Sequence, residues 1–230
     1  MRARLPRSDR LDIELGGAGW TLLAQRAALW RERHWLVLAD AHFGKAAAFR
    51  ARGVPVPQGT TSENLARLDA LVAATRPEVL VFLGDLFHAR EAHAPATLAA
   101  FREWRERHAA LELVLVEGNH DLAAGRPPAA LRIRCETEPW RVDTMAFCHQ
   151  PQQVRGACAM AGHIHPAVRL YGRGADSVRL PCFWVRDRLT VLPAFGSFTG
   201  GASIERGRGE RVIALAEERL FEIPDLRGAA

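Results

Sequence analysis

The chain has no long apolar run. The longest unbroken runs are short, such as Val79–Leu83, whereas a membrane-spanning helix needs about 20 apolar residues. No apolar stretch follows the basic N-terminus, which argues against a secretory signal. We therefore expect a cytoplasmic protein without membrane contact.

The four cysteines contain no C-x-x-C pair, which argues against a thiolate zinc site or a redox motif. In a reducing cytoplasm they are expected to be free, mostly buried thiols. A disulfide framework is the less favoured alternative in a chain of 230 residues.

Lysine is almost missing, because 31 basic residues include only one, Lys45. The bias towards arginine is typical of a skewed codon composition. The formal net charge of +5 agrees with a polyanionic partner such as nucleic acid. Lys45 lies three residues after the first motif described below, so it is either a site residue or the start of a solvated helix.

Strand and helix patterns alternate in the first half of the chain, and the second half is mostly strand. This order favours an α/β protein with two sheets packed face to face and helices outside, in a single domain over residues 1–230. Short apolar runs predict strands at 12–15, 20–23, 35–39, 79–83, 113–116, 144–148, 158–161, 168–171, 179–185 and 189–192, and a hairpin across 212–223.

Two helices are predicted, over residues 61–75 and 95–108. Thr60 or Thr61, placed before Glu63, is typical of a capping signal for the first helix. Its apolar residues recur at helical spacing and predict one buried face. The six tryptophans are expected in the core and in sheet packing rather than at a base-stacking platform.

Five segments combine carboxylate, carboxamide and imidazole side chains, and four of them end a predicted strand. They are Asp40-Ala-His42, Gly84-Asp85-Leu86-Phe87-His88, Gly118-Asn119-His120-Asp121, His149-Gln-Pro151 and Gly162-His163-Ile-His165. The carboxyl ends of strands are where α/β sheets place their sites. An Asp-x-His or His-x-His pair in extended backbone would put both side chains on one face. Such donors suit Mn²⁺, Fe or Zn²⁺.

Each segment has an ordinary structural explanation when taken alone. A Gly-Asp or Gly-Asn-His-Asp segment is often a turn, and a single histidine is often a satisfied core residue. Five such segments in one order, at strand ends, favour a metal centre instead.

The order D-x-H, G-D, G-N-H-D, H and G-H-x-H resembles that of the calcineurin-like metallophosphoesterase superfamily. This resemblance implies a two-sheet β-sandwich flanked by helices in four αββα layers. It also implies two divalent cations, with Mn²⁺ expected and Fe or Zn²⁺ as alternatives. By resemblance, one cation would be held by Asp40, His42 and His165, the other by Asn119, His149 and His163, and Asp85 would bridge the two.

The second motif departs from the G-D-x-x-D form of many members. Its G-D-L-F-H form resembles the nuclease subunit of the double-strand-break repair complex. Residues 42–45, 49–57 and 192–201 resemble the bacterial ligase-associated DNA damage response endonuclease/phosphodiesterase, a branch encoded with a DNA ligase and a helicase. The resemblance implies a phosphodiesterase or DNA endonuclease in DNA repair, acting through a metal-bridging hydroxide, with a functional link to a ligase and a helicase.

The same resemblance implies roles outside the ligand set. His120 would face the substrate and stabilise the transition state or protonate the leaving oxygen, and Asp121 would hold its other ring nitrogen. His88 would contact the phosphodiester or help the leaving group. Flanking phosphates would be received by Lys45, Arg50 and Arg52, although the two arginines also fit a solvated helix end.

Two other functions share these residues. A phosphatase or pyrophosphatase acting on nucleotides or other small phosphate esters would use the same metal site. A non-catalytic scaffold would keep the fold alone, but such relatives typically lose ligands, and the ligand set here is complete.

Overall fold

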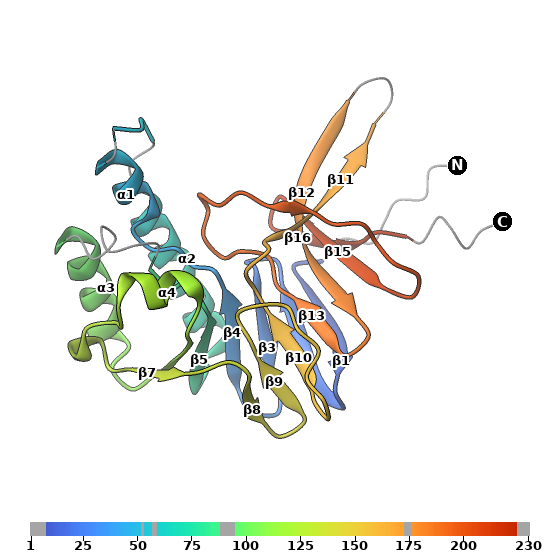
Figure 1. Ribbon diagram of the computed structural model, residues 1–230, viewed down its shortest axis with the longest axis horizontal. Helices are drawn as coiled ribbons and strands as arrows, with labels where there is room; N and C mark the ends of the chain where they lie inside the picture. The colour runs from blue at the N-terminus through green and yellow to red at the C-terminus, as the bar shows by residue number, and fades with distance from the viewer. Residues whose placement is uncertain (1–7, 52, 57–58, 88–94, 173–175, 225–230) are drawn as a thin grey trace.

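The computed structural model describes residues 8–51, 53–56, 59–87, 95–172 and 176–224. Within them, two β-sheets pack face to face, and the helices lie beside the first sheet (Figure 1). The predicted two-sheet α/β sandwich is confirmed.

The first sheet has seven strands, arranged in chain order. They are β1 (Arg10–Leu15), β2 (Ala18–Leu23), β3 (Ala27–Trp30), β4 (Trp35–Ala39), β5 (Val79–Leu83), β6 (Glu112–Val116) and β7 (Ile133–Glu136). Strands β4 to β7 run parallel, so their carboxyl ends meet at one edge of the sheet. The central strand β5 is apolar and buried throughout, as expected where both faces of a sheet are covered.

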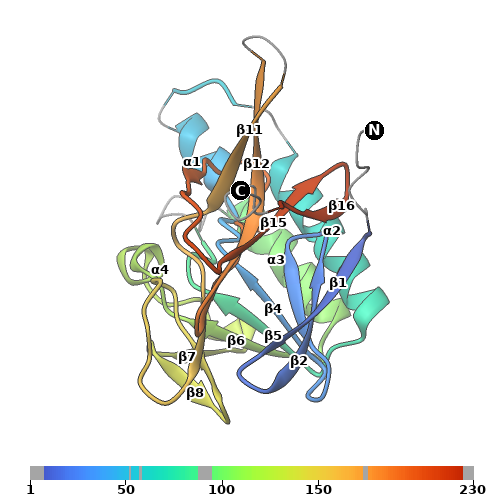
Figure 2. The ribbon, with the colours of Figure 1, turned by 90° about the vertical axis from the view of Figure 1, so that its right-hand side faces the viewer.

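The second sheet has nine strands and forms the other half of the sandwich (Figure 2). They are β8 (Trp140–Val142), β9 (Met145–Phe147), β10 (Cys158–Ala161), β11 (Pro166–Tyr171), β12 (Ser177–Arg186), β13 (Leu189–Val191), β14 (Ala202–Ser203), β15 (Arg211–Ala216) and β16 (Arg219–Glu222). Strands β9, β10 and β13 are parallel neighbours, so this sheet also has an edge of carboxyl ends.

The helices are α1 (Lys45–Ala51), α2 (Thr60–Thr75), α3 (Pro95–Arg107) and α4 (Asn119–Ala124), with a 3₁₀ turn at Ala129–Leu131. The predicted threonine cap on α2 is wrong. Thr60 already lies inside the helix, and Gly59 is the N-cap, with no side-chain cap. The predicted apolar face is confirmed, since Leu65, Leu68 and Leu71 are buried against the first sheet.

Aromatic side chains fill the space between the sheets, as predicted for the tryptophans. Trp20 stacks on Trp30 at 5.1 Å between ring centroids, and Trp35 stacks on Trp140 of the second sheet at 5.6 Å. Phe147, which precedes a predicted ligand, packs against the same cluster. This core therefore fixes the position of one sheet relative to the other.

A separate apolar cluster lies on the second sheet. Side chains of β9, β10 and β13 pack there against Val154 and Ala157 of a loop. None of the described helices is long and apolar enough to cross a membrane. The four cysteines are free, and burial raises the pKa of Cys182 to about 12.

Candidate metal centre

The predicted ligands gather where the carboxyl ends of the two sheets meet. Asp40 follows β4, Asp85 follows β5 after one glycine, and Asn119 follows β6. His149 follows β9 and His163 follows β10 in the opposite sheet. Parallel strands end at a common edge, so residues distant in sequence become neighbours.

Five of the predicted ligands have left-handed backbone. The φ angles are 52° at Asp40, 46° at His42, 49° at Asp85, 71° at His163 and 49° at His165. The expectation of extended Asp-x-His and His-x-His pairs is therefore wrong, because β4 ends at Ala39 and β11 begins only at Pro166. Non-glycine residues rarely adopt this conformation, and such strain concentrates at functional sites.

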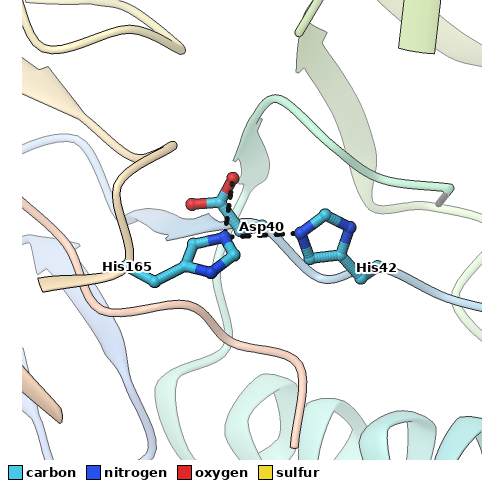
Figure 3. A group of neighbouring side chains, drawn as sticks. All are labelled: Asp40, His42 and His165. Atoms are coloured by element: carbon cyan, nitrogen blue, oxygen red, sulfur yellow. Dashed lines mark hydrogen bonds and ion pairs between the residues drawn. The ribbon is translucent and has the colours of Figure 1, made fainter. Parts of the chain in front are cut away.

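Asp40, His42 and His165 form the first group of donors (Figure 3). The Nε2 atoms of His42 and His165 are 3.3 Å apart, and Asp40 Oδ1 is 3.6 Å from His165 Nε2. Asp40 is fully buried, and its Oδ1 has no hydrogen-bond partner among the residues that the structure describes. A buried carboxylate oxygen without a partner is costly unless a cation satisfies it.

The tautomer of His165 follows from its other ring nitrogen. His165 Nδ1 lies 3.2 Å from the carbonyl oxygen of Gly200, and a carbonyl only accepts, so Nδ1 carries the hydrogen. In the neutral ring, Nε2 then presents a lone pair towards His42 and Asp40. A metal-binding histidine typically donates its second nitrogen to a carbonyl in this way.

The second group consists of Asp85, His149 and His163, joined by Asn119. His149 Nδ1 lies 3.2 Å from the Leu83 carbonyl, which leaves the Nε2 lone pair facing inwards. This Nε2 is 2.8 Å from Asn119 Oδ1 and 2.9 Å from His163 Nδ1.

Asp85 lies between the two groups. Its Oδ1 is 3.6 Å from His149 Nε2, and its Oδ2 is 3.7 Å from His42 Nε2. Burial raises the pKa of this carboxyl, and the nearby Asp40 raises it further, while His149 lowers it. The Asp85 carboxylate is thus placed to contact a cation in either group.

Two glycines permit this close packing. Gly84 has a φ of +73°, and a Cβ there would overlap the imidazole of His149. At Gly162, a Cβ would lie 2.5 Å from Asp40 Oδ2. The motif glycines therefore leave room for the neighbouring ligands.

The donor set itself fits divalent cations. Carboxylate oxygens and imidazole nitrogens converge in two groups, and within each group the ligand atoms lie within 4.8 Å of one another. The amide oxygen of Asn119 adjoins the second group at His149. Lone pairs that face each other at such distances repel, and a cation between them removes the repulsion.

Comparison with known proteins agrees with this geometry. The family model of the calcineurin-like phosphoesterases matches residues 34–192, which is more than half of the chain and includes every residue of both donor groups. The chain belongs to the calcineurin-like phosphoesterase family. It is therefore a metal-dependent phosphoesterase, in agreement with the family resemblance of its motifs.

This phosphoesterase is also similar to a solved structure, the nuclease MPE of Pseudomonas putida. The two chains are 42% identical, with a TM-score of 0.83, over 93% of this chain and 100% of that one. No curated protein matches the sequence.

His120 lies beside the donor groups of the phosphoesterase rather than inside them. Its Nε2 is 3.9 Å from Asp85 Oδ2, and its ring packs edge-on against His42 at 5.5 Å between centroids. Its backbone N–H donates to Asp85 Oδ1. The side chain is 40% exposed, so its ring is accessible from solvent.

Asp121 does not hold the His120 ring as expected. Its Oδ1 accepts the backbone N–H of Leu86 at 3.0 Å, and its Oδ2 accepts that of Gly118 at 2.9 Å. Burial raises the pKa of Asp121 to about 6, and the two backbone hydrogen bonds oppose that rise. The carboxylate ties the second motif to the third, which makes Asp121 a positioning residue.

The predicted phosphate-binding residues are only partly described. Lys45 begins α1, and its backbone N–H donates to the carbonyl of His42. Burial lowers the pKa of its ammonium, while the charges of Asp85 and Asp40 raise it. Arg50 is exposed in the last turn of α1. His88 and Arg52 lie outside the described residues.

Supporting residues that are not predicted from the sequence hold the loop after Leu192. Arg26 donates to the carbonyls of Ala194 and Gly196, and Arg67 donates to the carbonyl of Phe195 and lies 4.2 Å above its ring. Burial, together with the neighbouring Arg26, lowers the pKa of Arg67 to about 10. The loop so held carries Gly200, which orients His165.

Two further residues orient the backbone at the ligands. Glu138 accepts the N–H groups of both His149 and Gln150. Asn64 accepts the N–H of Ser197 in the same loop as Gly200. The sequence contained a sign of this role for Asn64, because Asn64 is a polar residue on the face of α2 that Leu65, Leu68 and Leu71 bury.

Proposed function

We propose that this phosphoesterase hydrolyses phosphodiester bonds in DNA with two divalent cations. The observation that carries the proposal is the position of Asp85, whose two oxygens face two separate donor groups. Similarity over nearly the whole chain to a protein named a nuclease supports a nucleic-acid substrate.

The first cation would be held by Asp40, His42 and His165, and the second by Asn119, His149 and His163, with Asp85 common to both. Mn²⁺ suits this mixture of oxygen and nitrogen donors, with Fe and Zn²⁺ as alternatives. When bound, such a pair supplies an activated water nucleophile and neutralises charge on the phosphoryl oxygens.

The chain's own contribution to the chemistry comes from His120. Its backbone N–H is fixed on Asp85 Oδ1, which holds the ring at the edge of the centre. From there the imidazole donates a proton to the leaving oxygen, or a hydrogen bond to the phosphoryl group in the transition state. Asp121 acts indirectly, because its carboxylate holds the backbone of the second motif at Leu86 to that of the third motif at Gly118.

DNA repair in the cytoplasm, in functional association with a DNA ligase and a helicase, is the biological setting that we propose. The motif resemblance to the ligase-associated branch supports it. The test is the survival of a deletion strain after DNA damage, with the ligase gene present and with it deleted. Survival equal to that of the parent strain in both backgrounds would contradict this setting, but it would not contradict the proposed hydrolysis.

A panel of metals and substrates tests the proposed activity. Single- and double-stranded DNA, a model diester and a model monoester are incubated with Mn²⁺, Mg²⁺, Zn²⁺ or chelator. We expect DNA and the diester to be cleaved, with Mn²⁺ most effective. A preference for monoesters with every metal, leaving DNA intact, would replace this function by that of a small-molecule phosphatase with the same centre.

His88 provides a second test of the substrate class. By the motif resemblance, it stands in the sequence where many phosphatase relatives carry an aspartate, so we propose that a donor replaces an anion at this position of the motif. The leaving group of a DNA diester is an alkoxide, which is a poorer leaving group than the phenoxide of an aryl monoester. An additional general acid therefore accelerates diester cleavage more than cleavage of the aryl monoester. We expect His88→Ala to reduce diester cleavage more than monoester cleavage, and equal losses would contradict this role.

A further inference from the structure

Strands β11 and β12 form an arm that begins directly at the metal centre. His165 is followed at once by Pro166, the first residue of β11. Figures 1 and 2 both show the outer part of this hairpin rising away from the two sheets. A strand that starts at a ligand and leaves the body of the protein provides a surface of fixed direction from the centre.

One face of the arm is basic. Arg169 of β11 lies directly opposite Arg179 of β12 in the antiparallel register, so their side chains share a face. Both are exposed, and neither forms an ion pair with a described carboxylate. Like charges directly opposite each other destabilise a sheet, so a bound anion would relieve an existing cost.

The basic face continues into a pocket beside the metal ligand. This pocket of about 150 Å³ is lined by Arg179, Arg26 and His165 together with the loop 197–201. The guanidinium of Arg26 is held on two backbone carbonyls and also has no carboxylate partner among the described residues. The volume admits a phosphate-sized group.

The same face ends on an exposed aromatic ring. Tyr171 lies two residues beyond Arg169, so its side chain points to the same side of the strand. It is 80% exposed and is the only tyrosine of the chain. An aromatic ring beside arginines is the combination on which unpaired nucleobases stack while their phosphates are neutralised.

We propose that this face of the arm binds the nucleotides that flank the phosphodiester held at the metal centre. One phosphate lies in the pocket between Arg26 and Arg179, the next contacts the Arg169–Arg179 pair, and an unpaired base stacks on Tyr171. This assignment rests on the proposed function. It makes the arm a specificity surface for nucleic acid over small phosphate esters.

The loop 197–200 lies between the basic face of the arm and Lys45, which the sequence analysis predicted to receive a flanking phosphate. Ser197, Thr199 and Gly200 line the pocket with Arg26, and the same three residues line a second hollow with Lys45 and Phe49. A nucleic-acid strand that crosses the loop therefore meets a basic residue in the hollow on each side of it, Arg26 on one and Lys45 on the other. The arm supplies one direction, and α1 supplies the other.

Two variants of the full-length chain test the arm, Arg169→Ala/Arg179→Ala and Tyr171→Ala. Binding of a labelled single-stranded oligonucleotide is measured by fluorescence anisotropy on an Asp85→Ala background, and hydrolysis of a model diester is measured in the otherwise wild-type protein. The matched control is Arg155→Ala/Arg188→Ala. These exposed arginines lie near the amino ends of β10 and β13, at the edge opposite the centre.

We expect the arginine double variant to lower the salt slope of single-strand binding by about 1.4, from two lost phosphate contacts at about 0.7 each. Tyr171→Ala should weaken binding by about 5- to 150-fold, and Tyr171→Trp should retain it. Model-diester hydrolysis should stay within about twofold of wild type in Tyr171→Ala, because this exposed side chain lies six residues beyond His165 in the chain.

The outcomes separate the two proposals. If wild-type protein cleaves DNA but the arm variants bind and cleave it like the control, the arm assignment is wrong and the proposed function stands. If wild type hydrolyses small esters and neither binds nor cleaves DNA, both fail. If the variants change only the oligomeric state, seen by light scattering, the face is a protein interface and the arm assignment is wrong.

Discussion

His42 and His165 face each other through their Nε2 atoms at 3.3 Å, although 122 residues separate them in the chain. The hydrogen on His165 sits on Nδ1, bound to Gly200, so a lone pair of His165 points at the His42 ring. Asp40 adds to the same point an oxygen that has no hydrogen-bond partner in the described part of the chain. Three donors aimed at one position destabilise the folded chain until a cation satisfies them.

Metal removal should therefore lower stability as well as activity. A ligand that binds only the folded state, at 100 times its Kd, adds about 2.7 kcal/mol. For a chain of this size that corresponds to about 5–10 °C in Tm. Differential scanning calorimetry with Mn²⁺ and with chelator measures the shift. Equal midpoints would show that the donor groups hold no cation in solution.

Asp85→Ala should abolish hydrolysis and lower the bound metal in both groups, because one carboxylate faces both. Elemental analysis of dialysed protein measures the metal content. Asp69→Ala is the control, since Asp69 pairs with Arg107 and His108 away from the centre. Full metal content in Asp85→Ala would exclude a bridging role.

His120→Ala should keep its metal and lose rate. Its ring lies outside both donor groups, so the loss should be in kcat, by about 10²- to 10⁴-fold for a diester with an alkoxide leaving group. The loss should be smaller for a p-nitrophenyl ester, whose leaving group needs little protonation. Metal loss in this variant would instead place His120 among the ligands.

Gly84→Ala should lower the free energy of unfolding by more than the strain of its left-handed backbone alone explains. Gly209 has a similar φ of +77° with open space around it, so Gly209→Ala should cost only about 1–2 kcal/mol. The Cβ at residue 84 must also displace His149. Urea unfolding and metal analysis of both variants check this, and equal costs with full metal content in both would contradict the close approach.

Lys45→Ala should weaken DNA cleavage more than cleavage of a small diester. Lys45 begins α1, and its backbone N–H donates to the carbonyl of the predicted ligand His42. We expect its side chain to receive a phosphate beyond the scissile one. One lost contact should lower the salt slope of single-strand binding by about 0.7. Equal losses in kcat/KM for both substrates would place Lys45 at the reacting phosphate instead.

Much of this architecture was predictable because its signals are local. Apolar runs such as Val79–Leu83 mark buried strands, and polar motifs directly after them mark the shared edge. Short elements such as β7, β8 and α4 carry too few residues for a periodic pattern, and they were not predicted.

The failures have a different origin, because they depend on contacts between distant parts of the chain. Arg26 meets Ala194 across 168 residues, and no local pattern announces that contact. Asp121 was assigned to its neighbour His120, yet its Oδ1 accepts the N–H of Leu86, 35 residues away. The left-handed ligands likewise follow from loop packing, which a strand pattern does not encode.

The division of the ligands between the sheets has a consequence for biosynthesis. The first sheet supplies Asp40, Asp85 and Asn119, whereas the histidines at 149, 163 and 165 come from the second. A nascent or prematurely released chain that ends before residue 149 lacks three of the seven predicted donors, however well its first sheet folds. The donor set of this phosphoesterase is therefore complete only when both halves of the polypeptide have folded against each other.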